Sequence, residues 1–368
     1  MRILTGATFF GAGGGGPVQP AVDMLDRLET ERGYSLEINL LDIDEIGPEE
    51  YAAMAAGLGS PLALIGKEFG PDSVRAFRVF QKALAMEGKT VSFLYSGELG
   101  GFNTFVHMLV SILSDRDPSK RIPLLDVDGN GRAVPELNTS LNSVRGFPPR
   151  PIGMGTLSGD EIILYPTDDA SAERMARALC QTSGMQIGFS TWGMRREELR
   201  LNAVCGALTA CERAGALLEE ACVQQVPPSE RLRESMDCRT IISGVVETVG
   251  IEMVDGFDVG QSRIRGDNGE AVTLAFQNEN LFAMDAAGRV LVNAPDLICV
   301  VGMEADCYRP LTNADIAEGM RVEVIAVPAH PLWWAEDKKA YRCWEPALKR
   351  AGFTGEMKRM KRMDEING

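Results

Sequence analysis

The chain has 368 residues, 45% of them hydrophobic and 24% charged, which is enough for a folded core and for two domains of ordinary size. Its formal net charge of −15 opposes binding to nucleic acid and to anionic lipid, and no apolar run reaches the roughly 18 residues of a membrane helix. The apolar stretch at the start is shorter than that of a secretory signal. We therefore expect a cytoplasmic protein that acts on a small molecule and binds neither nucleic acid nor membrane.

Short apolar runs alternate with helical patterns in the first part of the chain. The predicted strands are 35–43, 61–67, 90–96 and 122–128. The predicted helices are 21–33, 71–88 and 103–115, and residues 170–225 also have a mostly helical pattern. Because strands and helices alternate, the sequence predicts a layered α/β domain.

From about residue 238 the apolar period changes to that of strands. The turns 267–269 and 285–288 separate β-rich stretches and predict hairpins of a small antiparallel barrel or sandwich. The segment 334–352 predicts a helix, and the basic residues of 357–363 follow it. The sequence thus predicts an α/β domain over 1–237, a smaller all-β barrel-like domain over 238–332, and a C-terminal helix and tail over 333–368.

The stretch "LLDVDGNGRAVPEL" at 124–137 holds the densest group of polar side chains. An EF-hand calcium loop would need a glutamate at its twelfth position, but Leu137 stands there, and a strand comes before the loop. The favoured interpretation is a strand end that brings Asp126 and Asp128 to a ligand at the carboxyl edge of the sheet. A polar surface turn is the alternative.

A second polar cluster, "SGELGGFNTFVH" at 96–107, follows a predicted strand and begins a predicted helix. Asn103 and His107 are four residues apart and share one face of that helix. His107 is a candidate to meet Asp126 and Asp128, whereas a buried core histidine is the alternative interpretation. Glu98 precedes the glycines of this turn.

The glycine run at 11–16 is the third cluster. Gly11, Gly13 and Gly16 fit the GxGxxG spacing, and Asp42 and Asp44 follow at a distance that a dinucleotide-binding oxidoreductase would tolerate. Four consecutive glycines fit that fingerprint poorly and predict backbone pressed close to a ligand, a strand or a metal site. No lysine of a nucleoside triphosphate loop is present.

The cysteines and histidines limit the chemistry. Eight scattered cysteines form no CxxC pair, and two histidines exclude a three-histidine metal site within one chain. Cys205 is predicted in the middle of a helix, where close packing is favoured over a nucleophilic role. His330 is either a ligand from the second domain or a surface residue.

Six segments together resemble a known family. They are "FGAGGGGP", "ELGGFN", "DVDGNGRAVPEL", "FQNENL", "APDLI" and "VEVIAVPAHPLW". In this order they resemble the S-methyl thiohydantoin desulfurase-like family, which is associated with hydantoinase-type proteins. The resemblance spans about residues 8–335. It implies a three-layer α/β domain followed by a β-barrel-like domain, and a metal-dependent hydrolase of a small hydantoin-like ring. Asp255–Gly256–Phe257 replaces a Thr-Gly-Gly-Phe element of the family, which bears on the identity of the substrate.

A mechanism of this class would use a divalent metal, with zinc expected, to lower the pKa of bound water to about 7. The candidate metal ligands are Asp126, Asp128 and His107. Glu98 and Glu136 are the candidate catalytic acid and base. The remaining candidates are expected to bind the substrate and are Gly13, Gly14, Gly15, Asn103, Arg132, Gln277, Asn278 and Glu279.

Their chemistry suggests distinct roles in binding. Arg132 would pair with a substrate carboxylate, the amides of "QNEN" would bind ring N–H and C=O groups, and Asn103 with the glycine amides would stabilise an oxyanion. The alternative function is a non-catalytic binding protein or partner subunit of a hydantoinase-type amidohydrolase. The small-residue helices are compatible with a homo-oligomer.

Overall fold

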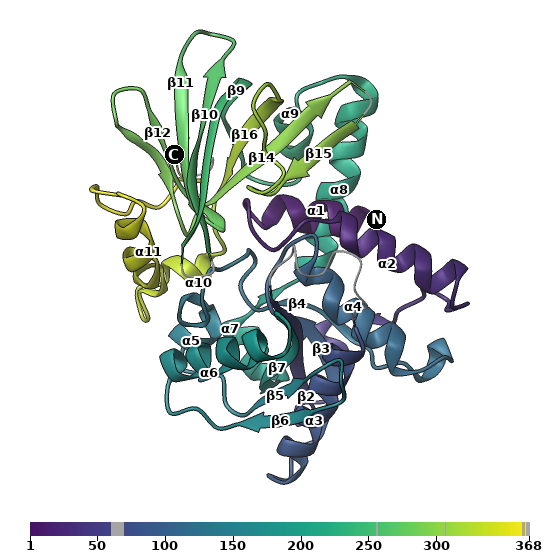
Figure 1. The fold of residues 1–368 in the computed structure, drawn as a ribbon. Coiled ribbons are helices and arrows are strands. Elements are labelled where there is room, and N and C mark those ends of the chain that lie inside the picture. The colour runs from purple at the N-terminus through teal and green to yellow at the C-terminus, as the bar shows by residue number, and fades with distance from the viewer. Residues whose placement is uncertain (60–69, 255–256, 306, 363–364, 366–368) are drawn as a thin grey trace. The chain divides into compact units, whose positions relative to one another are not determined.

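The computed structural model describes residues 1–59, 70–254, 257–305, 307–362 and 365, which form two compact units (Figure 1). The α/β unit comprises Val18–Gly131 and Glu136–Leu208. The β-rich unit comprises Met1–Pro17, Arg132–Pro135 and Thr209–Gly368. The segments 1–17 and 209–237, placed by the sequence prediction in the first domain, thus belong with the second sheet.

The α/β unit is built on a mixed sheet with the strand order β1-β4-β3-β2-β7-β5-β6, and β8 pairs with β4. Its strands are β1 Leu40–Leu41, β2 Tyr51–Gly59, β3 Val91–Ser96, β4 Leu124–Asp128, β5 Ile152–Gly155, β6 Glu161–Leu164, β7 Gln186–Arg195 and β8 Val204–Cys205. Neighbours from β1 to β2 in this order are parallel, and the other pairs are antiparallel.

Helices cover both faces of this sheet. They are α2 Gln19–Thr30, α3 Pro71–Ala85, α4 Asn103–Ser114, α5 Leu141–Val144, α6 Asp169–Thr182 and α7 Arg196–Asn202, with the short helices η1 Ile43–Glu45, η3 Pro118–Lys120 and η4 Leu137–Thr139. Met154 shares a core with Ala172 of α6, whereas a Cβ at Gly153 would lie 2.5 Å from the carbonyl of Ala76 in α3. Since successive strand residues face opposite sides, α3 and α6 lie on opposite faces, which gives three layers.

The β-rich unit contains an antiparallel sheet with the order β13-β12-β11-β10-β9-β16-β14-β15. Its strands are β9 Arg239–Val254, β10 Phe257–Gly266, β11 Ala271–Gln277, β12 Glu279–Asp285, β13 Val290–Asn293, β14 Leu297–Glu304, β15 Cys307–Leu311 and β16 Arg321–Val327. Both predicted hairpin turns join neighbouring strands, β10 to β11 and β12 to β13. The end strands β13 and β15 are not paired with each other over their described residues, so the predicted closed barrel is not confirmed.

Nor is this unit purely β. Its helices are α1 Arg2–Phe10, most of α8 Ala207–Gln224, α9 Pro228–Leu232, α10 Pro331–Trp334, η5 Ala340–Trp344 and α11 Glu345–Arg350. Across the described ranges, no helix is long and apolar enough to cross a membrane.

The structure corrects several predicted elements. The strand expected over 35–43 is reduced to the two residues of β1, and the helical pattern of 170–225 contains the ten-residue strand β7. The same helical pattern is also interrupted by β8, so Cys205 lies exposed in a short strand rather than in the middle of a helix. Gly206, which lies between β8 and α8, has φ +74°, a conformation outside the right-handed helical region that glycine readily adopts. The strand predicted at 61–67 and Asp255 and Gly256 lie outside the described residues.

Candidate functional site

Polar side chains gather where β3 and β4 end. The two strands are parallel neighbours with Ser96 opposite Asp128, and the amide of Gly129 donates to the carbonyl of Ser96 at 2.8 Å. The backbone therefore leaves the sheet at the same edge after β3 and after β4. Ligands bind at the carboxyl ends of strands in such sheets. A ligand-binding site in the α/β unit is thus expected at the segments 96–103 and 128–131.

The loop after β4 wraps around the carboxyl group of Asp128. Its Oδ1 accepts hydrogen bonds from the amides of Asn130 at 2.8 Å and Gly131 at 2.5 Å. Asn130 in turn donates to the carbonyl of Gly97 at 2.8 Å and accepts from the amide of Leu141 at 2.7 Å. Oδ2 of Asp128 is buried and has no hydrogen-bond partner among the described residues. The loop sequence thus fixes one carboxylate oxygen and leaves the other buried without a hydrogen-bond partner in the described chain.

Burial raises the pKa of Asp128 to about 7, although the amides of Asn130 and Gly131 oppose the shift. Near neutral pH this carboxyl can both hold and release a proton, which is the requirement for general acid–base catalysis. The neighbouring Tyr95 stays protonated, because burial raises its pKa well above the ordinary value.

Asn142 was not among the predicted residues but belongs to this group. Its Nδ2 donates to the hydroxyl of Tyr95 at 3.4 Å, and a Cβ at Gly129 would lie 3.3 Å from the same nitrogen. Its Oδ1 is buried and has no hydrogen-bond partner in the described part of the chain. The structure therefore brings a buried acceptor, Oδ1 of Asn142, close to the loop that holds Asp128.

Glu98 and Asn103 are brought together, as their positions in the turn suggest. Both are half-buried or more, and Nδ2 of Asn103 donates to Oε1 of Glu98 at the start of α4. Ser96 donates to the carbonyl of Glu98 at 3.0 Å, which ties this turn to the end of β3. Glu136 lies at the start of η4, where its amide donates to Thr139 at 3.1 Å.

The predicted metal ligands do not form a metal site. Oδ1 of Asp126 accepts the amide of Leu208 at 2.6 Å, so this carboxylate holds the start of α8. One oxygen of Asp128 is bound by two amides, and His107 is buried within α4. Among the described residues, no group of three or more His, Cys, Asp or Glu side chains is placed to hold a metal ion. The described side chains at this edge of the sheet therefore give no support to the zinc ion expected from the sequence, which stays a prediction.

His107 is a neutral core histidine in this structure. Burial lowers its pKa to about 3, and neither ring nitrogen has a hydrogen-bond partner among the described residues. The unfolded chain takes up a proton as the pH falls below about 6.5, whereas the folded chain does so only near pH 3, so folded stability declines as the pH falls across this window.

Replacing His107 with leucine is therefore expected to stabilise the protein. The gain should be about 2 kcal/mol larger at pH 5 than at pH 8, because the variant removes the protonation cost and the unpaired ring nitrogens. Urea unfolding at the two pH values measures this difference. A variant that is equally destabilised at both would show that the imidazole has a partner.

In the β-rich unit, the glycine run is packed against polar side chains. The carbonyls of Ala12 and Gly13 accept the amides of Asn280 and Asn313, each at 2.8 Å. A Cβ at Gly13 would lie 2.6 Å from Nδ2 of Asn313, and one at Gly14 would lie 2.1 Å from Oε1 of Glu279. Glycine is therefore required here by close contact within the unit.

Gly13 and Gly15 also have positive φ angles, of +93° and +72°. Oδ1 of Asn280 and Oδ1 of Asn313 are buried without a hydrogen-bond partner among the described residues. Asn313 carries no motif that would have marked it in the sequence.

The other predicted binding residues of this unit are engaged with the protein itself. Gln277 accepts Nε of Arg350 at 3.2 Å, and Asn278 has φ +55° in the turn between β11 and β12, where it accepts the amide of Asp258 at 2.9 Å. Buried Glu279 lies beside Gly14. Ring recognition by the amides of Gln277 and Asn278 is therefore not supported.

Arg132 is a buried structural cation. Its Nη1 donates to the carbonyls of Pro295 at 2.6 Å and Asp296 at 3.3 Å, and its guanidinium lies 4.3 Å from the ring centre of Trp344. Burial lowers its pKa to about 10. Nη2 lacks a hydrogen-bond partner among the described residues. The bidentate pair expected with a substrate carboxylate needs two guanidinium nitrogens, so Nη1 would have to give up its bonds to the carbonyls of Pro295 and Asp296.

Two alternative interpretations lose support. The glycine run follows the helix α1, whereas a dinucleotide fingerprint needs a preceding strand, and Asp42 caps η1 by accepting the amide of Asp44 at 2.8 Å. Partial burial and nearby Asp42 raise the pKa of Cys205, which opposes a thiolate nucleophile. His330 begins α10, where its Nδ1 accepts the amide of Leu332 at 3.4 Å.

Two family models together cover nearly the whole chain. Residues 1–166 match the S-Me-THD-like N-terminal domain, and residues 167–348 match the S-Me-THD-like C-terminal domain. A crystal structure of a protein from Chromobacterium violaceum has the same fold, with a TM-score of 0.79 and 23% identity over 98% of this chain and 97% of that chain. No curated protein matches this chain significantly.

Proposed function

Because this chain belongs to the S-Me-THD-like family, we propose that it hydrolyses a thiohydantoin-like five-membered ring, with S-methyl thiohydantoin as the representative substrate. The observation that carries the proposal is Oδ2 of Asp128, a buried carboxyl oxygen without a hydrogen-bond partner among the described residues, at the carboxyl ends of two parallel strands. The Chromobacterium violaceum protein is 23% identical to this chain, so the likeness supports the fold alone.

The reaction exchanges a thioether for a carbonyl. Water adds to the ring carbon that carries the methylthio group, forming a C–O bond, and the C–S bond then breaks. The products are the hydantoin and methanethiol, so one water is consumed for each ring. In this scheme Asp128 accepts one proton from the attacking water and passes it to the leaving sulfur, while the second proton of the water ends on the neighbouring ring nitrogen as the carbonyl forms. A carboxyl whose pKa is about 7 is suited to this transfer.

Two neighbouring groups have chemistry that suits the same ring. Oδ1 of Asn142 can accept a hydrogen bond from the ring N–H, since this oxygen has no other partner in the described chain. The pair of Glu98 and Asn103 offers a carboxylate and an amide at the start of α4. These groups would orient the substrate, and Asp128 would move the proton.

The first test is product formation by the purified protein. With S-methyl thiohydantoin, hydantoin and methanethiol are expected in equal amounts, measured by mass spectrometry because the eight cysteines of the chain would react with thiol dyes. The assay is run after treatment with a chelator and again with added zinc. Turnover that occurs only with added zinc would support the metal-dependent mechanism expected from the sequence.

Calorimetry on the same samples separates the alternatives. Binding of the ring without any product would favour the non-catalytic partner subunit over the hydrolase. If the protein neither binds nor converts the ring, the proposed function is wrong.

A further inference from the structure

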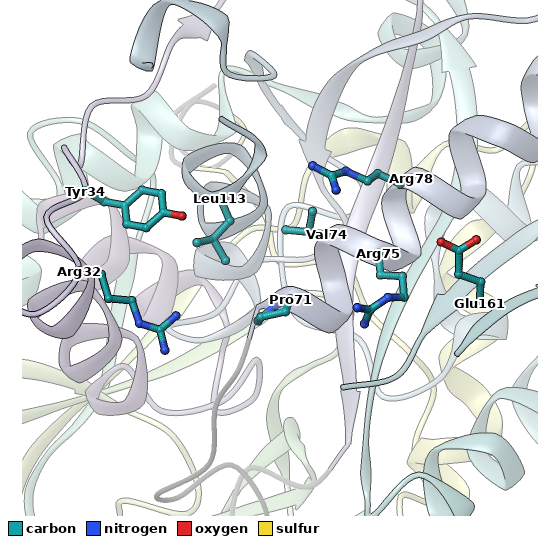
Figure 2. A pocket seen from close by; sticks show the side chains of 8 residues that line it. All are labelled: Arg32, Tyr34, Pro71, Val74, Arg75, Arg78, Leu113 and Glu161. Carbon is teal, nitrogen blue, oxygen red and sulfur yellow. The ribbon is translucent and has the colours of Figure 1, made fainter. Parts of the chain in front are cut away.

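The α/β unit contains a cavity of about 310 Å³ away from the residues assigned above (Figure 2). It lies between the segment that follows α2, the first turns of α3 and the last turn of α4. Arg32 and Tyr34 line one side, Arg75 and Arg78 line the other, and Val74 and Leu113 lie between them. A volume near 300 Å³ is at the small end of the range for ligand sites.

Positive charge is concentrated at this cavity in a chain whose net charge is −15. Arg78 is exposed and has no hydrogen bond or ion pair among the described residues, whereas Nη1 of Arg75 donates to the carbonyl of Thr156. Glu161 is the acidic residue of the lining, and Lys82 pairs with it at 2.7 Å. The carboxylate of Glu161 is thus already paired with Lys82, and it does not balance the charge of Arg78.

The opposite side of the cavity is held in place by a further cation. The guanidinium of Arg116 lies 3.9 Å from the ring centre of Tyr34, and its Nη1 donates to the carbonyl of Arg32 at 2.6 Å. The Tyr34 ring is thus fixed against the cavity. Like charges around one cavity repel one another unless an anion lies between them.

We propose that this cavity binds a small organic anion. Its carboxylate or phosphate oxygens would pair with the guanidinium groups of Arg75 and Arg78, whose planar donors match such oxygens. Its apolar part would lie on Val74 and Leu113, because these side chains line the cavity between the charged sides. The site goes beyond the proposed ring hydrolysis and does not depend on it.

The probes are benzoate and inorganic phosphate, titrated into the full chain by calorimetry at constant ionic strength. Saturable binding is expected, with benzoate tighter than phosphate if the natural ligand is a carboxylate and the reverse order if it carries a phosphate. The double variant Arg75→Gln/Arg78→Gln should bind at least about 10-fold more weakly. Arg78→Gln alone tests the same point if the double variant does not fold.

Arg289→Gln is the matched control for Arg78→Gln, since the side chain of Arg289 is 77% exposed in the other unit and both single substitutions remove one positive charge. Its affinity for both probes should equal that of the wild type. The absence of saturable binding of either anion, or equal binding by the Arg78 variant, would overturn the proposal. Ring hydrolysis is measured separately on each variant, so failure of one proposal is distinguishable from failure of the other.

Discussion

Replacing Asp128 with asparagine is expected to lower kcat/KM for S-methyl thiohydantoin by roughly 10²–10⁴-fold, the usual contribution of a general acid or base. Asparagine keeps an oxygen that can accept the amides of Asn130 and Gly131, so the loop should retain its conformation. It cannot exchange a proton. The measurement is the initial rate of hydantoin formation by wild type and variant at pH 7.

Asp126→Asn is the matched control because it makes the same chemical change two residues away in the same strand. Oδ1 of Asp126 serves as an acceptor for the amide of Leu208, and an asparagine oxygen can do the same. Its activity should stay within about tenfold of the wild type. Full activity of Asp128→Asn would remove Asp128 from the mechanism, and equal losses in both variants would point to the metal pair expected from the sequence.

The same Asp128 variant should also change the pH dependence of stability. The pKa of Asp128 is raised from 3.8 to about 7, so between these pH values the folded chain holds a proton that the unfolded chain has released. Folded stability therefore falls as the pH rises through this window and stays low above it. Asparagine carries no charge, so the variant should exceed the wild type by up to about 4 kcal/mol at pH 8 and match it near pH 4.

A residue that weakens the fold while supporting the reaction is typical of a functional site. If Asp128→Asn loses both activity and stability at pH 8, the carboxyl is a structural group and the activity loss has no mechanistic meaning. Urea unfolding across pH 4–8 distinguishes these outcomes.

Part of the α/β unit, namely β3, β4 and the helices α2, α3 and α4, could be predicted because its signals are local, whereas β2, β5 and β6 were not predicted. The apolar runs that form β3 and β4 and the helical period of α4 are each contained within a few residues of sequence. β7 could not be recognised in this way. Its first seven residues are all buried, so it has no polar alternation, and flanking helical patterns made the region look continuous.

The site was predictable only in part, because long-range contacts decide the role of each side chain. Asp126 and Asp128 have the same side chain and lie in the same motif. Only the structure shows that the carboxylate of Asp126 accepts a hydrogen bond from the amide of Leu208, 82 residues later in the chain. The glycine run indicated a close approach but not its partner, which is Glu279 and its neighbours. Asn142 carries no motif, and its position beside Gly129 follows only from the fold.

Gly14→Ala is the second substitution with a large expected effect. A Cβ at Gly14 would lie 2.1 Å from Oε1 and 2.6 Å from Cγ of Glu279, and Glu279 is 2% exposed. The glutamate cannot move freely, so the variant should lose about 1–3 kcal/mol of stability, the usual cost of overpacking. Gly250→Ala is the control, because its Cβ would have nothing closer than 4.0 Å.

A double-mutant cycle with Glu279→Ala tests whether this contact is the cause. If it is, Gly14→Ala should cost at least about 1 kcal/mol less in the Glu279→Ala background, since the clashing side chain is gone. The denaturation midpoints of the four proteins give the coupling energy. The opposite result is zero coupling, with the stability of Gly14→Ala unchanged and its binding of the ring lost. That result would mean that the glycine run contacts the ligand, because the added methyl group would then affect ligand binding and not folding.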